Sequence, residues 1–178
     1  MAITIPNIFV PNTLVQSTPV NANFSTIETY INTTLETAAA HTADIALLPK
    51  GKMGIASITA NTATYTTTIT DLGLSVTFTA LASRFYKITG VVLIQSSVAD
   101  DSVALYIRDG AGTQLQQASQ QLRLASVSQV LTATVTVQPG AGSKTYKLSS
   151  NRLTGTGNVN VVAGATFPSF ILIEDIGL

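Results

Sequence analysis

The sequence predicts a mainly β protein in which an extended arm and a single helix precede an antiparallel β-sandwich of jelly-roll type. Threonine, a β-branched residue that favours strands, accounts for 27 of the 178 residues. From Met53 to the C-terminus apolar and polar residues alternate with period two, whereas the preceding segment has helical spacing. Charged residues make up only 10% of the chain, so hydroxyl and amide groups must cover most of its surface.

Residues 1–23 form the predicted arm. Pro6, Pro11 and Pro19 each disfavour helix in the residue before them. The arm is apolar enough to serve as an anchor on a larger partner, and docking onto that partner would order it, whereas in the isolated protein it is either a disordered tail or already ordered. The predicted anchoring residues are Ile3, Ile5, Ile8, Phe9, Val10 and Leu14.

A helix is predicted from Pro19 to Leu48, capped by Thr18 and ended by Pro49. A lone helix with one apolar stripe needs a partner, and copies of itself are the simplest one. We therefore predict a trimeric, coiled-coil-like stalk, which with its hinge at Lys50–Lys52 occupies residues 24–52. The seam of this stalk comprises Phe24, Ile27, Ile31, Ala38, His41, Ile45 and Leu48.

Residues 53–178 form the predicted head, with eight to ten strands. The candidate strands are 64–70, 72–78, 85–94, 103–108, 114–124, 131–137, 145–148, 159–162 and 170–173. Turn-forming clusters separate them at residues 99–102, 109–112, 138–142 and 155–158. The last strand is apolar on both faces, so it is either central in a sheet or faces another subunit. We favour the second alternative and place Phe170 and Leu172 in the oligomer interface.

Few residues suit catalysis or metal binding, and neither an enzyme nor a cofactor is predicted. The chain has no cysteine, and its one histidine, His41, falls in the stalk, away from any Ser-His-Asp arrangement in the head. In a trimer His41 would gather three imidazoles at the axis, where a polar core position is favoured over a metal or anion site. Asp100, Asp101 and Asp109 lack the spacing of a calcium loop and are assigned to turns.

Two further acidic residues, Glu174 and Asp175, are adjacent in the last strand and must point to opposite faces. They cannot act together on one substrate, and each is expected to pair with an arginine or lysine from a neighbouring strand. The head tyrosines either stack on sugars or fill the core, and no receptor-binding residue is assigned. These tyrosines are Tyr65, Tyr86, Tyr106 and Tyr146.

The formal net charge is zero, so neither nucleic acid nor an anionic membrane is an expected partner. No apolar run is long enough to span a membrane, and the N-terminus lacks the charged start of a signal peptide. Synthesis in a cytoplasm is expected.

Both ends of the chain resemble virion proteins of tailed bacteriophages. Residues 11–27, PNTLVQSTPVNANFSTI, are similar to an N-terminal motif of these proteins that leads into a short helix. Residues 167–177, FPSFILIEDIG, are similar to the ending of phage minor tail and fibre proteins. The resemblance implies an N-terminal virion anchor, a trimeric stalk and a β-sandwich head in a particle assembled in the host bacterial cytoplasm.

The resemblance implies two alternative roles. The first is a short trimeric fibre that binds other virion proteins through its arm and a bacterial surface glycan through its head. The second is a head fibre or decoration protein that stabilises the capsid surface. The chain lacks the repeats and collagen-like shaft of long tail fibres, which favours a short fibre or a decoration protein.

Overall fold

The computed structural model describes residues 17–178, apart from the side chains of residues 17–20, 39, 43, 44 and 46. The chain divides into two compact units, Met1–Leu48 and Pro49–Leu178, which are described separately. The predicted anchoring residues of the arm, from Ile3 to Leu14, lie outside the described residues.

The first unit contains one helix, α1, from Ser17 to Leu47. The single helix was therefore predicted correctly, but the extended arm cannot reach Asn23, because residues 17–23 are already helical. Pro19 is compatible with this earlier start, because the first turn of a helix needs no backbone N–H donor. Within residues 17–178, no helix is long and apolar enough to cross a membrane.

Threonine is frequent in α1, which has three acidic residues and no lysine or arginine. Six threonine hydroxyls donate to the carbonyl oxygen four residues earlier, at 2.8–2.9 Å. These bonds satisfy the hydroxyls within the helix itself. The donors are Thr26, Thr29, Thr33, Thr34, Thr37 and Thr42.

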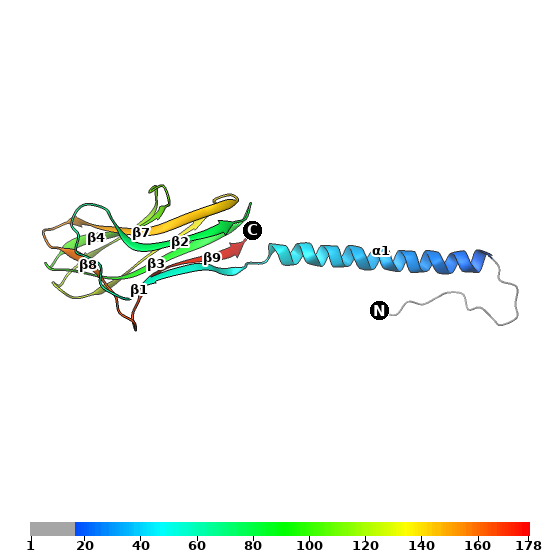
Figure 1. The fold of residues 1–178 in the computed structure, drawn as a ribbon, viewed down its shortest axis with the longest axis horizontal. Helices are drawn as coiled ribbons and strands as arrows, with labels where there is room; N and C mark the ends of the chain where they lie inside the picture. The colour runs from blue at the N-terminus through cyan, green and yellow to red at the C-terminus, as the bar shows by residue number, and fades with distance from the viewer. Residues whose placement is uncertain (1–16) are drawn as a thin grey trace. The chain divides into compact units, whose positions relative to one another are not determined.

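The second unit is built from nine strands in two antiparallel sheets (Figure 1). Sheet A has the order β1-β9-β3-β6, with β8 also paired to β3, and sheet B has the order β2-β7-β4-β5. The strands are β1 (Gly51–Ile58), β2 (Thr70–Ala80), β3 (Phe85–Ser96), β4 (Asp101–Asp109), β5 (Gln114–Leu122), β6 (Gln129–Val137), β7 (Gly142–Thr154), β8 (Val159–Val162) and β9 (Ser169–Gly177).

This order is that of a jelly roll. Strands β8 and β9 pair with the same edge of β3, opposite the edge that β6 occupies, and only residues 163–168 interrupt them. If β8 and β9 are counted as one interrupted strand, each of the two sheets has four strands, as in a jelly roll. The predicted mainly β fold class is therefore confirmed, and each predicted turn cluster lies at or beside a connection between strands.

Three predicted segments differ from the structure. The strand predicted at residues 145–148 is only the middle of β7, which extends from Gly142 to Thr154. The hinge at Lys50–Lys52 is largely part of β1, an edge strand whose two glycines and irregular register at residues 52–54 hide its alternation. Residues 64–69 precede β2 as a loop in spite of their threonines. Tertiary contacts fix this loop, because the backbone of Tyr65 pairs with Val159 and the carbonyl oxygen of Thr66 accepts from the N–H of Arg152.

The core is a single apolar layer between the two sheets. Every second residue of β2, β3 and β9 is buried there, as the alternation predicts. Two glycines of sheet A face side chains of sheet B closely, since a Cβ at Gly90 would overlap Leu148 and one at Gly54 would overlap Val76. The largest fully buried side chains are Leu74, Tyr86, Ile88, Val92, Ile94, Val103, Leu105, Ile107, Leu122, Leu148, Ile171 and Ile173.

A buried ion pair closes one end of this layer. Arg84 donates from Nε to Asp175 Oδ2 at 2.7 Å and from Nη2 to Asp175 Oδ1 at 2.9 Å. Burial alone would raise the pKa of Asp175, but the hydrogen bonds from Arg84 and the Gly177 N–H and the charges of Arg84 and Lys50 hold it below its usual value. Glu174 points to the other face and lies 3.7 Å from Lys87, so both carboxylates are paired as the sequence predicted.

A second buried carboxylate closes the opposite end. Asp101 accepts from the backbone N–H groups of Thr156 and Gly157, both at 3.0 Å, and from the hydroxyl of Ser96. It thereby fixes the turn between β7 and β8. Asp109 lies at the far end of the same strand, where it accepts from the Thr113 N–H at 2.7 Å. These carboxylates therefore serve turns, as expected, and lie too far apart to share one calcium ion.

Because Ile173 faces the core and Leu172 the outside of sheet A, the two residues should respond differently to truncation. We expect Ile173→Ala to lower the free energy of unfolding by about 2–5 kcal/mol, since it leaves a cavity. Leu172→Ala should lower it clearly less. Urea denaturation of both variants measures the difference, and equal losses would mean that the outer face of β9 is covered in solution.

Candidate binding surface

The outer faces of the two sheets differ in chemistry. On sheet A, apolar side chains lie next to one another in register, as in the pairs of Ile55 with Leu172 and Leu93 with Val130. Lys87 pairs with Glu174 on this face, and Lys52 is the register partner of the same glutamate. The part of the face over β3 and β6 is partly polar, with Thr89, Thr132, Thr134 and Thr136. The apolar members of the sheet A face are Ile55, Val91, Leu93, Val130, Val162, Phe170 and Leu172.

On sheet B the outer face is polar from edge to edge. Hydroxyl side chains extend outward from β2 and β7, and glutamines extend from the edge strand β5. Tyr106 lies among them but is almost fully buried, and its hydroxyl donates to Asn151 Oδ1 at 3.0 Å. The polar members of the sheet B face include Ser75, Thr77, Thr79, Thr145, Ser149, Asn151, Gln117, Ser119 and Gln121.

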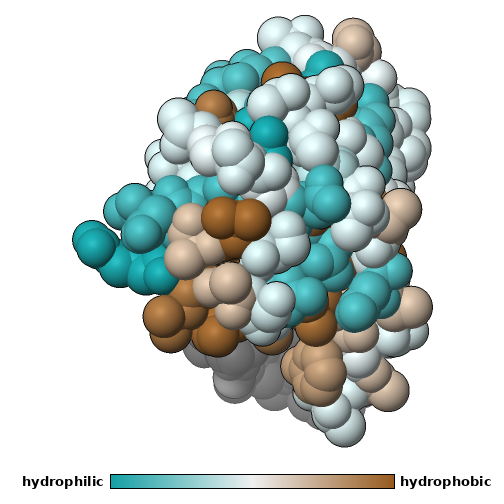
Figure 2. Space-filling model, turned by 90° about the vertical axis from the view of Figure 1, so that its left-hand side faces the viewer, coloured by the Kyte–Doolittle hydropathy of each residue, from teal (hydrophilic) through white to brown (hydrophobic). Residues whose placement is uncertain are grey.

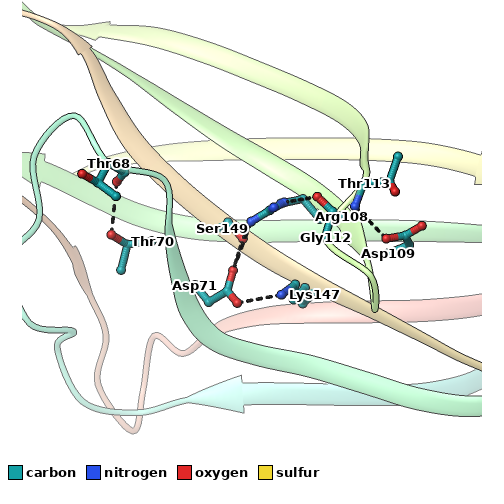
Figure 3. Close-up of polar contacts among 9 residues, drawn as sticks. All are labelled: Thr68, Thr70, Asp71, Arg108, Asp109, Gly112, Thr113, Lys147 and Ser149. Atoms are coloured by element: carbon teal, nitrogen blue, oxygen red, sulfur yellow. Dashed lines mark hydrogen bonds and ion pairs between the residues drawn. The ribbon is translucent and has the colours of Figure 1, made fainter.

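Three charged side chains meet in the middle of the sheet B face (Figure 3). Lys147 on β7 donates to Asp71 Oδ2 at 2.7 Å, and the hydroxyl of Ser149 donates to Asp71 Oδ1. Arg108 on β4 approaches the same carboxylate, with Nη1 3.5 Å from Asp71 Oδ1. Strands β2, β7 and β4 each supply one member, so this charged cluster exists only when the three strands lie side by side.

The cations determine the ionisation of Asp71. Burial alone would raise its pKa, but hydrogen bonds from Lys147 and Ser149 and the charges of Lys147 and Arg108 outweigh it. The pKa of Asp71 is therefore below its ordinary value, and the carboxylate is charged at neutral pH. Arg108 is oriented from its other side as well, because its Nε donates to the carbonyl oxygen of Gly112 at 2.7 Å.

A hollow of about 290 Å³ adjoins the charged cluster and is lined by Asp71, Gly73, Leu74, Ser75, Lys147 and Leu148. It lies where the pairing of β2 with β7 is interrupted between Asp71 and Ser75. Gly73, with φ +72°, makes this irregularity possible and leaves open space where a side chain would stand. A larger hollow, of about 490 Å³, lies between the β4–β5 and β6–β7 turns, with Asp109 and Lys144 among its lining residues.

None of the four head tyrosines forms an exposed stacking surface. Tyr65, Tyr86 and Tyr146 belong to the core, and burial raises the pKa of Tyr65 to about 12. Tyr106 faces outward but is only 4% exposed. The alternative in which they fill the structure is therefore correct, and recognition of a sugar on the sheet B face would depend on hydrogen bonds.

The predicted seam residues of the stalk lie along α1 or directly after it, and most are exposed. Phe24 is 66% and Ile45 67% exposed, whereas Ile27 is half-buried. Ile31, Ala38, His41 and Leu48 are exposed as well. In the head, Phe170 and Leu172 are half-buried on the sheet A face, because β9 is central in its sheet but nothing in the second unit covers its outer side.

The end of the sandwich where β4, β6 and β8 begin has a mixed surface. Figure 2 looks onto this end, and hydrophobic residues gather toward the lower part of the view while polar residues cover the upper part. The exposed apolar residues of these loops include Val98, Leu124 and Val127. This end is therefore less uniformly polar than the sheet B face.

No group of three histidine, cysteine, aspartate or glutamate side chains that could hold a metal ion occurs among the described residues. Sequence reasoning did not single out Asp71, Arg108, Lys147 or Ser149. Each was visible as a polar position of an alternating strand, but the pairing of β2 with β7 and of β7 with β4 joins residues up to 78 positions apart.

Solved structures resemble the chain only distantly. The C-terminal domain of EclA, a sugar-binding protein, is 14% identical over 68% of this chain and 77% of its own, with a TM-score of 0.38. Eiger TNF from S. frugiperda is 11% identical over 71% and 94%, with a TM-score of 0.38. The CBM22-1 xylan-binding domain of Paenibacillus barcinonensis Xyn10C is 12% identical over 74% and 87%, with a TM-score of 0.34.

Similarity at this level carries no argument about function. No protein-family model and no curated protein matches the sequence.

Replacing Asp71 by asparagine should expose the repulsion between Lys147 and Arg108. Because the folded-state pKa of Asp71 lies below its unfolded value, its contribution to stability is full above about pH 4 and is lost as the pH falls through the folded pKa. Asp71→Asn should therefore lower the melting temperature at pH 7 and have little effect near pH 2. The control is Asp100→Asn. Asp100 lies in an exposed loop with φ 62°, a conformation that asparagine also tolerates, so this substitution should leave the melting temperature unchanged at both pH values.

Proposed function

We propose that the chain is a non-enzymatic structural component of a tailed-bacteriophage virion, a short trimeric fibre that exposes its jelly roll for adhesion to a host-surface glycan. The virion assignment rests on the resemblance of residues 11–27 and 167–177 to phage virion proteins. In this role the N-terminal arm attaches to the particle, α1 forms the stalk, and the second unit is the adhesive head.

The polar sheet B face is the observation that carries the adhesive role. Saccharides present many hydroxyl groups, and a binding surface must offer donors and acceptors to replace the water that these groups lose. The hydroxyls of Ser75, Thr77 and Thr145 and the amide of Gln117 provide both on one flat sheet. Because this surface is broad and nearly neutral, it suits a neutral or weakly charged carbohydrate better than a polyanion.

The exposed stripe of α1 supports the trimer. Isolated helices gain little stability from propensity alone, and most of it comes from covering an apolar face. Phe24, Ile31 and Ile45 recur every seven residues along α1 or at twice that interval, and all three are exposed. Three copies packed along this stripe would cover the side chains that the single chain leaves in water.

The apolar sheet A face favours a second candidate, a decoration protein of the capsid surface. Contiguous exposed apolar residues mark protein contacts, and in this role Phe170, Leu172 and their neighbours would pack against the major capsid protein. Copy number separates the candidates: a capsid protein follows icosahedral counts, whereas a tail fibre is present in three or six copies or a small multiple of them.

Adhesion is tested by immobilising the full-length chain and measuring retention of a panel of purified bacterial surface polysaccharides. We expect saturable retention of at least one member, which the free polysaccharide competes away. If no member is retained, the adhesive role is wrong and the decoration protein becomes the preferred function.

For the stalk, we expect Ile31→Asp to reduce the mass of the full-length chain in light scattering from that of a trimer toward that of a monomer. Three carboxylates at the seam would be buried without partners, which is strongly unfavourable. Thr34→Asp, three residues away at a position that is already polar, should reduce it far less. Equal effects of the two substitutions would show that the heptad assignment is wrong, and a monomeric wild type would exclude the stalk.

A further inference from the structure

The charged cluster of the sheet B face has an unbalanced charge. Arg108 and Lys147 are direct partners in the register of β4 and β7, so two cations stand opposite each other on one face. Like charges in this position destabilise a sheet. One carboxylate, Asp71, lies between them, so the cluster retains one positive charge.

The unused hydrogen-bonding capacity of the two cations is that of donors. Lys147 has three N–H donors and places one of them on Asp71 Oδ2. Arg108 uses Nε on Gly112, and Nη1 only approaches Asp71 and Ser149 at 3.5 Å. Asp71 already accepts on both oxygens. A group that completes this site must therefore bring acceptor oxygens and a negative charge.

Three other charged groups of the head are locally compensated. Arg84 pairs with Asp175, Lys87 with Glu174, and Asp101 accepts from two backbone N–H groups. Residues 49–178 hold all nine Lys and Arg and six of the nine Asp and Glu, so the head carries a formal charge of +3, and of these cations Arg108 and Lys147 are register partners on the sheet B face. This arrangement fits one isolated anionic group better than a nucleic acid.

The surroundings of the two cations supply neutral hydrogen-bonding groups. The hollow beside Lys147 is open at Gly73 and is lined by the hydroxyl-bearing Ser75. Across the strands, Thr77 and Thr145 bond to each other at 2.7 Å and extend the row of hydroxyls. A ligand with one anionic group and several hydroxyls would therefore place the anionic group on the two cations and its hydroxyls on the neighbouring Ser75, Thr77 and Thr145.

We propose that Arg108 and Lys147 bind the carboxylate of an acidic saccharide, while the hollow beside Gly73 and Ser75 receives the hydroxyls of the same sugar residue. This inference rests on the adhesive function proposed above and names its ligand class. Lys147 and Arg108 provide charge-assisted donors for the carboxylate, and Asp71 holds both cations in place when no ligand is bound.

The test is calorimetric titration of the full-length chain with two galacto-oligosaccharides that carry a single carboxylate, one ending in galacturonic acid and one in sialic acid, and with neutral galacto-oligosaccharides of the same length. We expect at least one acidic ligand to bind at least tenfold more tightly than the neutral one, and its affinity to fall as the salt concentration rises. Lys147→Gln should weaken binding of the acidic ligand at least tenfold, because it removes one of the two cations. Lys87→Gln, the same substitution on the sheet A face, should have no effect.

A loss of binding in Lys147→Gln could also arise from misfolding, so a second variant that should gain affinity is measured beside it. Asp71→Asn raises the net charge of the cluster and releases donors of Lys147, so it should bind the acidic ligand more tightly than the wild type does. Melting temperatures of all variants are compared first, and both predicted changes of affinity must occur in folded protein.

Equal binding of acidic and neutral ligands, unchanged in Lys147→Gln, would overturn the acidic-saccharide site and leave the adhesive function standing. Retention of surface polysaccharides without binding of either carboxylated ligand would overturn it as well. Failure of every saccharide in both experiments would overturn the adhesive function itself.

Discussion

The apolar layer between sheets A and B is the constraint on which the rest of the head depends. Strands β2, β3 and β9 contribute every second residue to this layer, and a Cβ at Gly90 would overlap the Leu148 side chain of the opposite sheet. With few charges available, the ends of the layer are closed by buried carboxylates, Asp175 paired with Arg84 at one end and Asp101 on backbone donors at the other. Each carboxylate is satisfied, which burial of a charge requires.

The inner faces of both sheets form the core, whereas the outer faces of the two sheets differ in chemistry. Sheet A presents apolar side chains around Phe170 and Leu172, whereas sheet B presents hydroxyls, amides and the charged cluster of Asp71, Arg108 and Lys147. A two-residue period permits this division because neighbouring residues of a strand point to opposite sides. The proposed division of labour, protein contacts on one face and saccharide on the other, follows from that geometry.

The C-terminal segment that resembles phage proteins has a structural role in this fold. Residues 169–177 form the central strand of sheet A, Asp175 of this segment pairs with Arg84, and the hydroxyl of Ser169 lies 3.2 Å from the backbone N–H of Leu93. The motif is therefore accounted for by packing and ion pairing within the head. The side chains of this segment that remain accessible include Phe167, Phe170, Leu172 and Ile176.

The sequence by itself determined the helix, the mainly β class, most of the strands and the opposite orientations of Glu174 and Asp175. These features depend on periodicity, proline positions and turn residues, all of which act over short distances along the chain. The tertiary structure alone decided that residues 51–58 form an edge strand, that residues 64–69 form a loop, and that the tyrosines are buried. It also decided which polar residues meet, since strand pairing joins Asp71 to Lys147 and Ser149 across more than seventy residues. Local sequence patterns do not show which strands pair when they are far apart in the sequence. That pairing depends on how all the strands together bury their apolar side chains in one core.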